Sequence, residues 1–154
     1  MKRKPLFWIF AVITILWIAF IFSNSLDDGI KSGEKSGFVT ALINSTLQFF
    51  GFEGNVSEKT VRTLAHFGEF AILSVFLCID LTLYFKEKYY IFALSVPACF
   101  IVAVIDEIIQ KFSAGRAMQF SDMLIDTLGA LCATIIFFCI KYLILSLKKK
   151  KKVQ

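Results

Sequence analysis

Four long runs of apolar residues leave this chain few possible folds. They cover residues 6–22, 61–85, 89–110 and 122–147. Because a helix rises about 1.5 Å per residue, even the shortest run would extend over about 26 Å, just enough to cross a bilayer core. Hydrocarbon offers the backbone no hydrogen-bonding partner, so helices are the expected structure of such runs. The pattern predicts an all-α polytopic membrane protein with four transmembrane helices.

The composition excludes the soluble alternatives. Of the 154 residues, 57% are hydrophobic and 19% are charged, whereas soluble domains are about 45–50% apolar and about 25% charged. A soluble chain of this length would bury only about 68–70% of its surface, too little to hide these side chains. The net charge of +5 comes from the lysine run at residues 148–152, which is typical of a basic tail at a membrane surface. We therefore expect lipid neighbours and no nucleic-acid partner, while the oligomeric state stays open.

The first apolar run allows two interpretations. It follows a basic N-terminus and ends near Ser23-Asn24-Ser25, which could serve as a signal-peptide cleavage site. Its length exceeds the usual 7–15 residues of a signal-peptide core, and further spans follow it, so we interpret it as a retained signal anchor. The whole chain, residues 1–154, is then one membrane domain with a core at about residues 6–147 and a basic tail at residues 148–154.

A shorter apolar stretch, residues 38–52, precedes the second span. Its Phe38, Leu42 and Phe49 recur at near-helical spacing, but polar residues interrupt it and it is too short to cross a bilayer. We expect an interfacial or re-entrant helix here.

The basic residues indicate how the spans are oriented. With the N-terminus in the cytoplasm, ten lysines and arginines lie inside and six lie outside. Cytoplasmic loops carry an excess of Lys and Arg, so this distribution predicts that both termini are cytoplasmic. On this topology, ten of the twelve acidic residues fall toward the outer face.

Polar residues gather at the predicted outer ends of three spans. On the second span, a spacing of four and three residues places three of them on one helical face. Together with the end of the third span, the start of the fourth and the loop between them, the set is Arg62, His66, Glu69, Asp106, Glu107, Gln110, Arg116, Asp122 and Asp126. Ionisable groups at membrane depth are costly and normally face a cavity or one another. The sequence therefore predicts a polar pocket that opens to the outer face.

A purely structural interpretation of these charges is also open. Arg62 could pair with Asp106 or Asp122, and His66 could donate a structural hydrogen bond, because ion-pair networks also cluster charge. Elsewhere on the spans, Gly129, Ala130 and Ala133 would let a neighbouring helix approach the fourth span closely. Near the inner face, Asp80 and Lys141 lie at one depth, and we expect them to form a structural pair between two helices.

The residue types in the predicted pocket suit chemistry on a phosphate-bearing substrate. Arginines hold phosphate through paired hydrogen bonds, and a histidine can act as general acid or base. Carboxylates supply hard oxygen ligands for Mg²⁺ or Ca²⁺, so a divalent metal is possible and its candidate ligands are Asp106, Asp122 and Asp126. The predicted catalytic residues are His66, Asp106, Glu107, Asp122 and Asp126. The predicted binding residues are Arg62, Glu69, Gln110 and Arg116.

The motifs at these positions resemble the VanZ-like family. Residues 62–73 read RTLAHFGEFAIL, residues 106–112 read DEIIQKF, and residues 122–130 read DMLIDTLGA. With Phe22-Ser23-Asn24-Ser25 and Gly115-Arg116, these blocks follow the family's order over about residues 6–145. Two details depart from the family pattern, because Ala114 stands where the loop often has proline and no glutamine lies near Ser25.

The resemblance implies a small integral protein of the bacterial cell membrane that affects susceptibility to glycopeptide antibiotics of the teicoplanin type. The family's motif residues carry over to Arg62, His66, Asp106, Glu107, Gln110, Arg116, Asp122 and Asp126. Three functions stay open for the predicted pocket. It could catalyse a reaction on a lipid-linked or cell-wall substrate, it could bind or transport a membrane lipid or lipid-linked cell-wall intermediate, or its charges could only assemble the helices.

Overall fold

The described part of the chain is built from helices alone. The computed structural model describes residues 3–150, and within this range the helices are α1 (Arg3–Ser25), α2 (Gly29–Phe49), α3 (Glu58–Tyr84), α4 (Lys88–Phe112) and α5 (Phe120–Lys150). Lys2 and residues 151–154, which carry part of the predicted orientation and of the basic tail, lie outside the described residues.

The number of transmembrane helices agrees with the sequence. Four helices are long and apolar enough to cross a bilayer, and they cover Pro5–Ser25, Glu58–Tyr84, Lys88–Phe112 and Phe120–Lys149. Three of them contain the whole of one apolar run, and Glu58–Tyr84 contains all of the run at residues 61–85 except residue 85. The predicted all-α fold with four transmembrane helices is thus confirmed.

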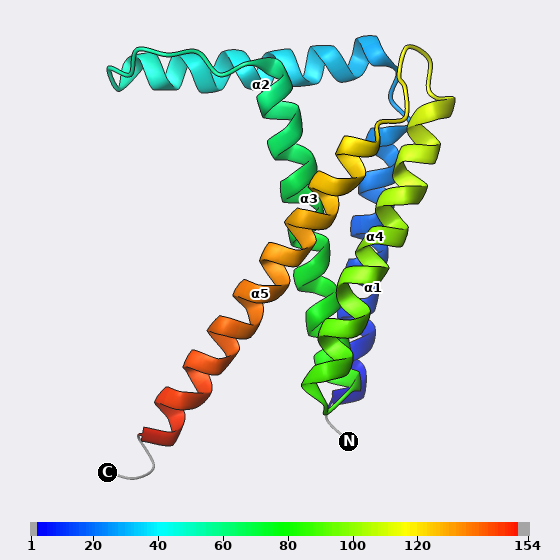
Figure 1. Ribbon diagram of the computed structural model, residues 1–154, viewed down its shortest axis with the longest axis vertical. Helices are drawn as coiled ribbons and strands as arrows, with labels where there is room; N and C mark the ends of the chain where they lie inside the picture. The colour runs from blue at the N-terminus through cyan, green and yellow to red at the C-terminus, as the bar shows by residue number, and fades with distance from the viewer. Residues whose placement is uncertain (1–2, 151–154) are drawn as a thin grey trace.

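The spans run alternately up and down (Figure 1). The start of α1 and the end of α5 lie at the same end of the bundle, as an even number of crossings requires. At the opposite end, α2 lies across the spans at a steep angle, next to the loop that joins α4 to α5. This end, which we call the α2 end, is where the predicted pocket residues are placed.

The remaining helix, α2, which is not one of the four spans, begins earlier than the sequence predicted. It starts at Gly29 rather than at residue 38, because the Asp28 side chain caps it by accepting a hydrogen bond from the Lys31 backbone N–H at 2.7 Å. None of its residues is buried, and Phe38 and Phe49 are exposed. Its orientation across the spans is that of an interfacial helix rather than a re-entrant one.

The closest packing in the bundle joins α3 to α5. A side chain at Gly129 would place its Cβ 2.3 Å from the carbonyl oxygen of Phe67, so the two backbones approach to a distance that only glycine permits. Ala130 and Ala133 are also buried, as the sequence predicted. Further along, the Ser74 hydroxyl donates to the carbonyl oxygen of Ala130 at 2.9 Å. Small residues and a hydroxyl therefore set the crossing of these two helices.

The predicted pair between Asp80 and Lys141 is wrong. Asp80 instead accepts a hydrogen bond of 2.6 Å from the hydroxyl of Thr14 on α1, and the Lys141 ammonium donates to the hydroxyl of Thr82 at 3.3 Å. The reason is the direction of Asp80, which faces α1 rather than α5, while Lys141 reaches α3 at Thr82. Spacing along two helices gives a common depth, but it does not show which neighbouring helix a side chain faces.

The Gly129 contact leads to a test of the α3–α5 packing. Gly129→Ala should lower the free energy of unfolding by about 1–3 kcal/mol, because the added methyl group has no space beside Phe67. Gly68→Ala is the matched control, since a Cβ at that helical position meets nothing within 4 Å. Thermal unfolding in detergent should show a lower midpoint for Gly129→Ala only, and equal midpoints for the two variants would contradict this packing.

Candidate functional site

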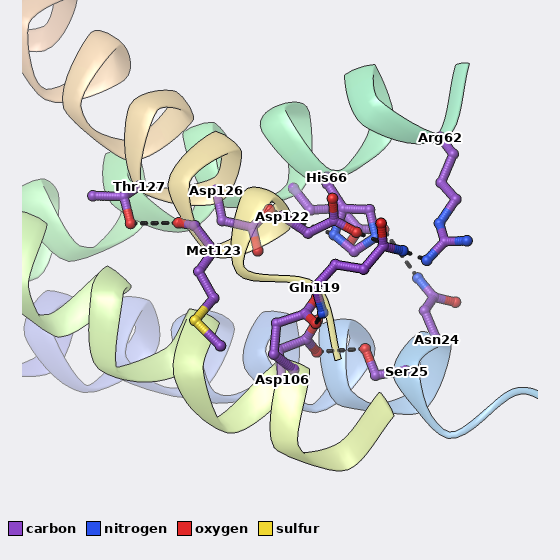
Figure 2. A network of polar contacts seen from close by, with 12 residues as sticks. Asn24, Ser25, Arg62, His66, Asp106, Gln119, Asp122, Met123, Asp126 and Thr127 are labelled. Carbon is purple, nitrogen blue, oxygen red and sulfur yellow. Dashed lines mark hydrogen bonds and ion pairs between the residues drawn. The ribbon is translucent and has the colours of Figure 1, made fainter. Parts of the chain in front are cut away.

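The predicted polar residues converge at the α2 end of the bundle. Side chains from α1, α3, α4 and α5 point toward one another there, and the loop between α4 and α5 closes over them (Figure 2). Asp106, Glu107, Gln110 and Asp126 are fully buried. Buried charges of this kind need partners, and the contacts below show how far each charge is satisfied.

Asp106 is held by hydrogen bonds from two helices. The hydroxyl of Ser25, at the end of α1, donates to its Oδ1 at 2.5 Å, and the amide of Gln110, one turn further along α4, donates to its Oδ2 at 2.9 Å. Ser113 strengthens the same contact by donating to the carbonyl oxygen of Ser25 at 2.8 Å. The end of α1 is thus fastened to the end of α4 through a buried carboxylate.

The loop at residues 113–119 is held by two hydrogen bonds that involve its backbone. The backbone N–H of Gln119 donates to Oε2 of Glu107 at 2.7 Å, and the N–H of Gly29 donates to the carbonyl oxygen of Ala114 at 2.8 Å. Gly115 has a φ of 72°, a conformation that favours glycine. A Cβ at Gly29 would lie 2.7 Å from the Gly115 carbonyl oxygen, so the start of α2 also needs glycine at this contact.

Arg116 extends from this loop into the site and forms no ion pair with a described carboxylate. Its guanidinium donates to the side-chain oxygen of Gln110 at 2.9 Å and to the carbonyl oxygen of Asn24 at 3.1 Å. No carboxylate of the described residues lies within ion-pair distance of it, and its Nε has no hydrogen-bond partner among them. Burial lowers the pKa of Arg116, and nearby Arg62 adds to the effect, but an arginine keeps its charge in proteins.

Arg62 and Asp122 form the pair that the structural interpretation allowed. Nη2 of Arg62 lies 3.8 Å from Oδ2 of Asp122, which is too long for a hydrogen bond. The Arg62 side chain remains 35% exposed. Its donor groups are therefore open to a further ligand, so a structural pair and a binding role are compatible at this residue.

His66 and Asp126 lie together beneath Arg62, one from α3 and one from α5 (Figure 2). Nδ1 of His66 is 3.4 Å from Oδ1 of Asp126. Neither His66 Nδ1 nor either carboxylate oxygen of Asp126 has a hydrogen-bond partner among the described residues. Ligand atoms of His66, Asp106 and Asp126 all lie within 4.8 Å of one another, so these three residues could hold a metal ion.

A pocket of about 190 Å³ opens beside these residues, between α1, α2 and α3. Its cationic and imidazole groups come from Lys35, Arg62, His66 and Arg116, and its acids are Asp27 and Glu69. Arg62 also lines two further hollows of about 390 and 350 Å³ toward α5 and the loop. Arginine side chains are thus presented to solvent on several sides of the α2 end.

The two acids of the pocket are already occupied. Asp27 is paired with Lys31 and Lys35, and their hydrogen bonds hold the pKa of its carboxyl below the usual value. Glu69 accepts a hydrogen bond of 3.0 Å from the side chain of Asn24. Asn24 is neutral, so this hydrogen bond does not neutralise Glu69. Arg116 likewise contacts only neutral oxygens, and the pocket keeps a positive group that is not neutralised by a direct contact.

The structure places all nine predicted site residues at one end of the bundle and separates them into groups. Asp106 and Asp126, two of the three candidate metal ligands, lie in the His66 cluster. The third, Asp122, is the partner of Arg62 instead. Glu107 and Gln110 face the loop and Arg116.

Several residues of the site were not predicted from the sequence. Asn24 and Ser25 contact Glu69 and Asp106, and Lys35 lines the pocket from α2. The signal for the first two was present, because polar residues directly after an apolar run lie at the same depth as the outer ends of the other spans. Lys35 had no such signal, since its position depends on the fold-back of α2.

The contact between Ser25 and Asp106 can be tested by removing one hydroxyl. Ser25→Ala should lower the free energy of unfolding by about 1–3 kcal/mol, because it leaves a buried carboxylate oxygen without its donor. Ser23→Ala is the control, since the exposed Ser23 hydroxyl donates only to the carbonyl oxygen of Phe20 in its own helix. If thermal unfolding in detergent gives equal midpoints for both variants, this buried contact does not stabilise the bundle.

Comparison with known proteins adds one finding. A family model described as VanZ/LLP1 matches residues 10–143, a range that contains every residue of the site described above. No similarity to a curated protein or to a solved structure was found.

Proposed function

The chain belongs to the VanZ/LLP1 family of multi-pass membrane proteins, and from this premise we propose that it binds the phosphate of a lipid-linked envelope component in its polar pocket. In this proposal the pocket faces outward from a bacterial cell membrane and both termini are cytoplasmic. Binding of such a component would affect susceptibility to teicoplanin-type glycopeptides, as the resemblance to the VanZ-like family implies.

The observation that carries this proposal is the unpaired guanidinium of Arg116 beside Arg62. Both residues line the same pocket, and Arg116 contacts only neutral oxygens of Asn24 and Gln110. A half-buried cation without a counter-ion attracts an anion, and guanidinium groups match phosphate geometry with paired donors. Two arginines at one pocket therefore favour a phosphate group as the ligand.

The surroundings of the arginines suit a lipid head group. Hydroxyl groups of Ser32 and Ser36 line the same pocket as Lys35, and Val39 and Val61 add apolar surface. α2 lies across the ends of the spans (Figure 1), at the level where an interfacial helix would meet lipid phosphates. A ligand with a phosphate head and an apolar chain would find both kinds of contact here.

A catalytic role is the second candidate, and the geometry of His66 and Asp126 favours it. His66 lines the pocket, and its Nδ1 and the Asp126 carboxylate have no hydrogen-bond partner, as is expected of groups that act on a ligand. Asp106 and Glu107 would then position the site, because both accept hydrogen bonds from the protein. Asp122 would position Arg62.

The phosphate proposal predicts a specific loss of affinity. Arg116→Gln should weaken binding of a polyprenyl phosphate by about 10–100-fold, since a charge-assisted hydrogen bond contributes about 1.5–3 kcal/mol. Binding is measured with purified protein in nanodiscs, and competition by inorganic phosphate shows whether the head group alone is recognised. Lys111→Gln is the control, because it removes an exposed cation from the same end of the bundle.

The affinity measurement and a complementation assay together decide between the functions. Unchanged affinity in Arg116→Gln, or an equal loss in Lys111→Gln, would overturn phosphate binding in the pocket. In a deletion strain assayed for glycopeptide sensitivity and lipid-intermediate levels, His66→Gln separates the two candidates. Lost complementation with retained lipid binding supports catalysis, whereas a parallel loss of both supports binding alone.

The proposed orientation predicts which loops face the cell exterior. In a background without the exposed Cys132 and Cys139, a cysteine introduced by Gly54→Cys should react with an impermeant maleimide in intact cells. A cysteine introduced by Lys86→Cys should react only after permeabilisation, because its loop lies at the opposite end of the bundle. The reverse labelling pattern would place the pocket on the cytoplasmic side.

A further inference from the structure

We propose that His66, Asp106 and Asp126 form a binding site for one divalent first-row transition metal ion. These residues come from α3, α4 and α5, and the structure brings a ligand atom of each within 4.8 Å of the others. Figure 2 shows the three side chains as parts of one polar network, into which they extend from three different helices. The site does not depend on the proposed phosphate ligand, because Asp106 and Asp126 do not line that pocket and only His66 is common to both.

Asp126 has unmet hydrogen-bonding capacity. Its side chain is fully buried, yet neither of its two oxygens has a hydrogen-bond partner among the described residues, and Nδ1 of His66 beside it also has none. A buried polar group left without a partner is unfavourable, and more so if it is charged. One ligand atom of each residue lies in the cluster, where a bound cation would supply a missing partner.

The balance of charge in the cluster also favours a bound cation. Two carboxylates lie close together here away from solvent, and Glu107 is buried nearby. Protonation of His66 would offset only one negative charge. Arg62 and Arg116 contact other groups, namely Asp122 and the neutral Gln110. A divalent cation offsets both carboxylates at once, and buried charges that lack a partner are otherwise strongly unfavourable.

One of the proposed ligands, Asp106, is supported by hydrogen bonds from its neighbours. Asp106 is oriented by the Ser25 hydroxyl at 2.5 Å and by the Gln110 amide at 2.9 Å. Metal-binding carboxylates in proteins are commonly held by hydrogen bonds of this kind, which fix the direction of the ligand. Because Ser25 belongs to α1, all four spans contribute to the arrangement of the site.

The ligand set indicates the class of metal. One imidazole nitrogen and two carboxylate oxygens suit Zn²⁺, Mn²⁺ or Fe²⁺, whereas Mg²⁺ and Ca²⁺ prefer oxygen ligands alone. The sequence predicted an all-carboxylate ligand set that included Asp122. In the structure His66 takes the place of Asp122 in the ligand set, which changes the preferred metal from Mg²⁺ or Ca²⁺ to a transition metal. Three protein ligands leave coordination positions for water or for a bound oxygen, and the pocket lined by His66 gives access to them.

Metal binding can be measured without any lipid ligand. Purified protein is stripped with EDTA, and ZnCl₂, MnCl₂ and MgCl₂ are each titrated by calorimetry, with metal content determined by mass spectrometry. We expect about one equivalent of Zn²⁺ or Mn²⁺ per chain and much weaker binding of Mg²⁺. Asp126→Asn and His66→Gln should each weaken the binding by more than about 100-fold, since even outer-shell changes commonly cost 10–100-fold.

The controls separate this site from other sources of binding. Asp80→Asn removes a buried acid that bonds to Thr14 at the opposite end of the bundle, so it should bind metal like the wild type. Cys132 and Cys139 are exposed thiols, and the titration is therefore repeated with both changed to serine. With Co²⁺ as probe, visible d–d bands without thiolate charge-transfer absorption would support nitrogen and oxygen ligation.

The proposal is overturned by any of three results. The wild type binds no more metal than Asp126→Asn, the Asp80→Asn variant loses binding to the same extent, or the stoichiometric binding disappears in the cysteine-free background. Size-exclusion chromatography and circular dichroism verify that each variant is folded. If Asp126→Asn does not fold, the comparison of His66→Gln with the wild type decides. Metal binding without phosphate binding shows that the phosphate proposal has failed. Phosphate binding without metal binding shows that the metal proposal has failed.

Discussion

The cost of burying charge in an apolar bundle governs the arrangement of this protein. Asp106, Glu107 and Asp126 lie fully buried among helices whose other surfaces are largely aliphatic and aromatic, and such groups are stable only with partners. α1 supplies the Ser25 hydroxyl, and the loop after α4 supplies the Gln119 backbone N–H. The contacts to Asp106 and Glu107 are therefore the same contacts that hold the ends of the spans together.

The site that results has two unlike halves. Toward α2 it presents Arg62 and Arg116 in an open pocket, and beneath them the carboxylates of Asp106 and Asp126 lie close to His66. His66 belongs to both halves, since it lines the pocket and contacts Asp126. Basic groups at the mouth and acidic groups below would suit an anionic ligand accompanied by a cation, and the two proposals made above describe these two components separately.

Much of this architecture could be predicted from the sequence, because a bilayer restricts the choice of structure. Hydrophobic length alone defines four spans, and helical spacing places Arg62, His66 and Glu69 on one face. Predictions that required distances between helices were less secure. Spacing does not distinguish Asp106 from Asp122 as the partner of Arg62, and the pair between Asp80 and Lys141 was wrong because Asp80 faces α1 instead of α5.

The sequence by itself determined the fold class, the number of spans and the end of the bundle where the polar residues gather, because each depends on local hydrophobicity and periodicity. Only the tertiary structure decided that α2 folds across this end, that Ser25 satisfies Asp106, and that His66 rather than Asp122 joins Asp106 and Asp126. Those outcomes depend on how closely two helices approach. At the α3–α5 crossing the helices can approach this closely because Gly129 has no side chain and its backbone packs against that of Phe67. These two residues are far apart in the chain.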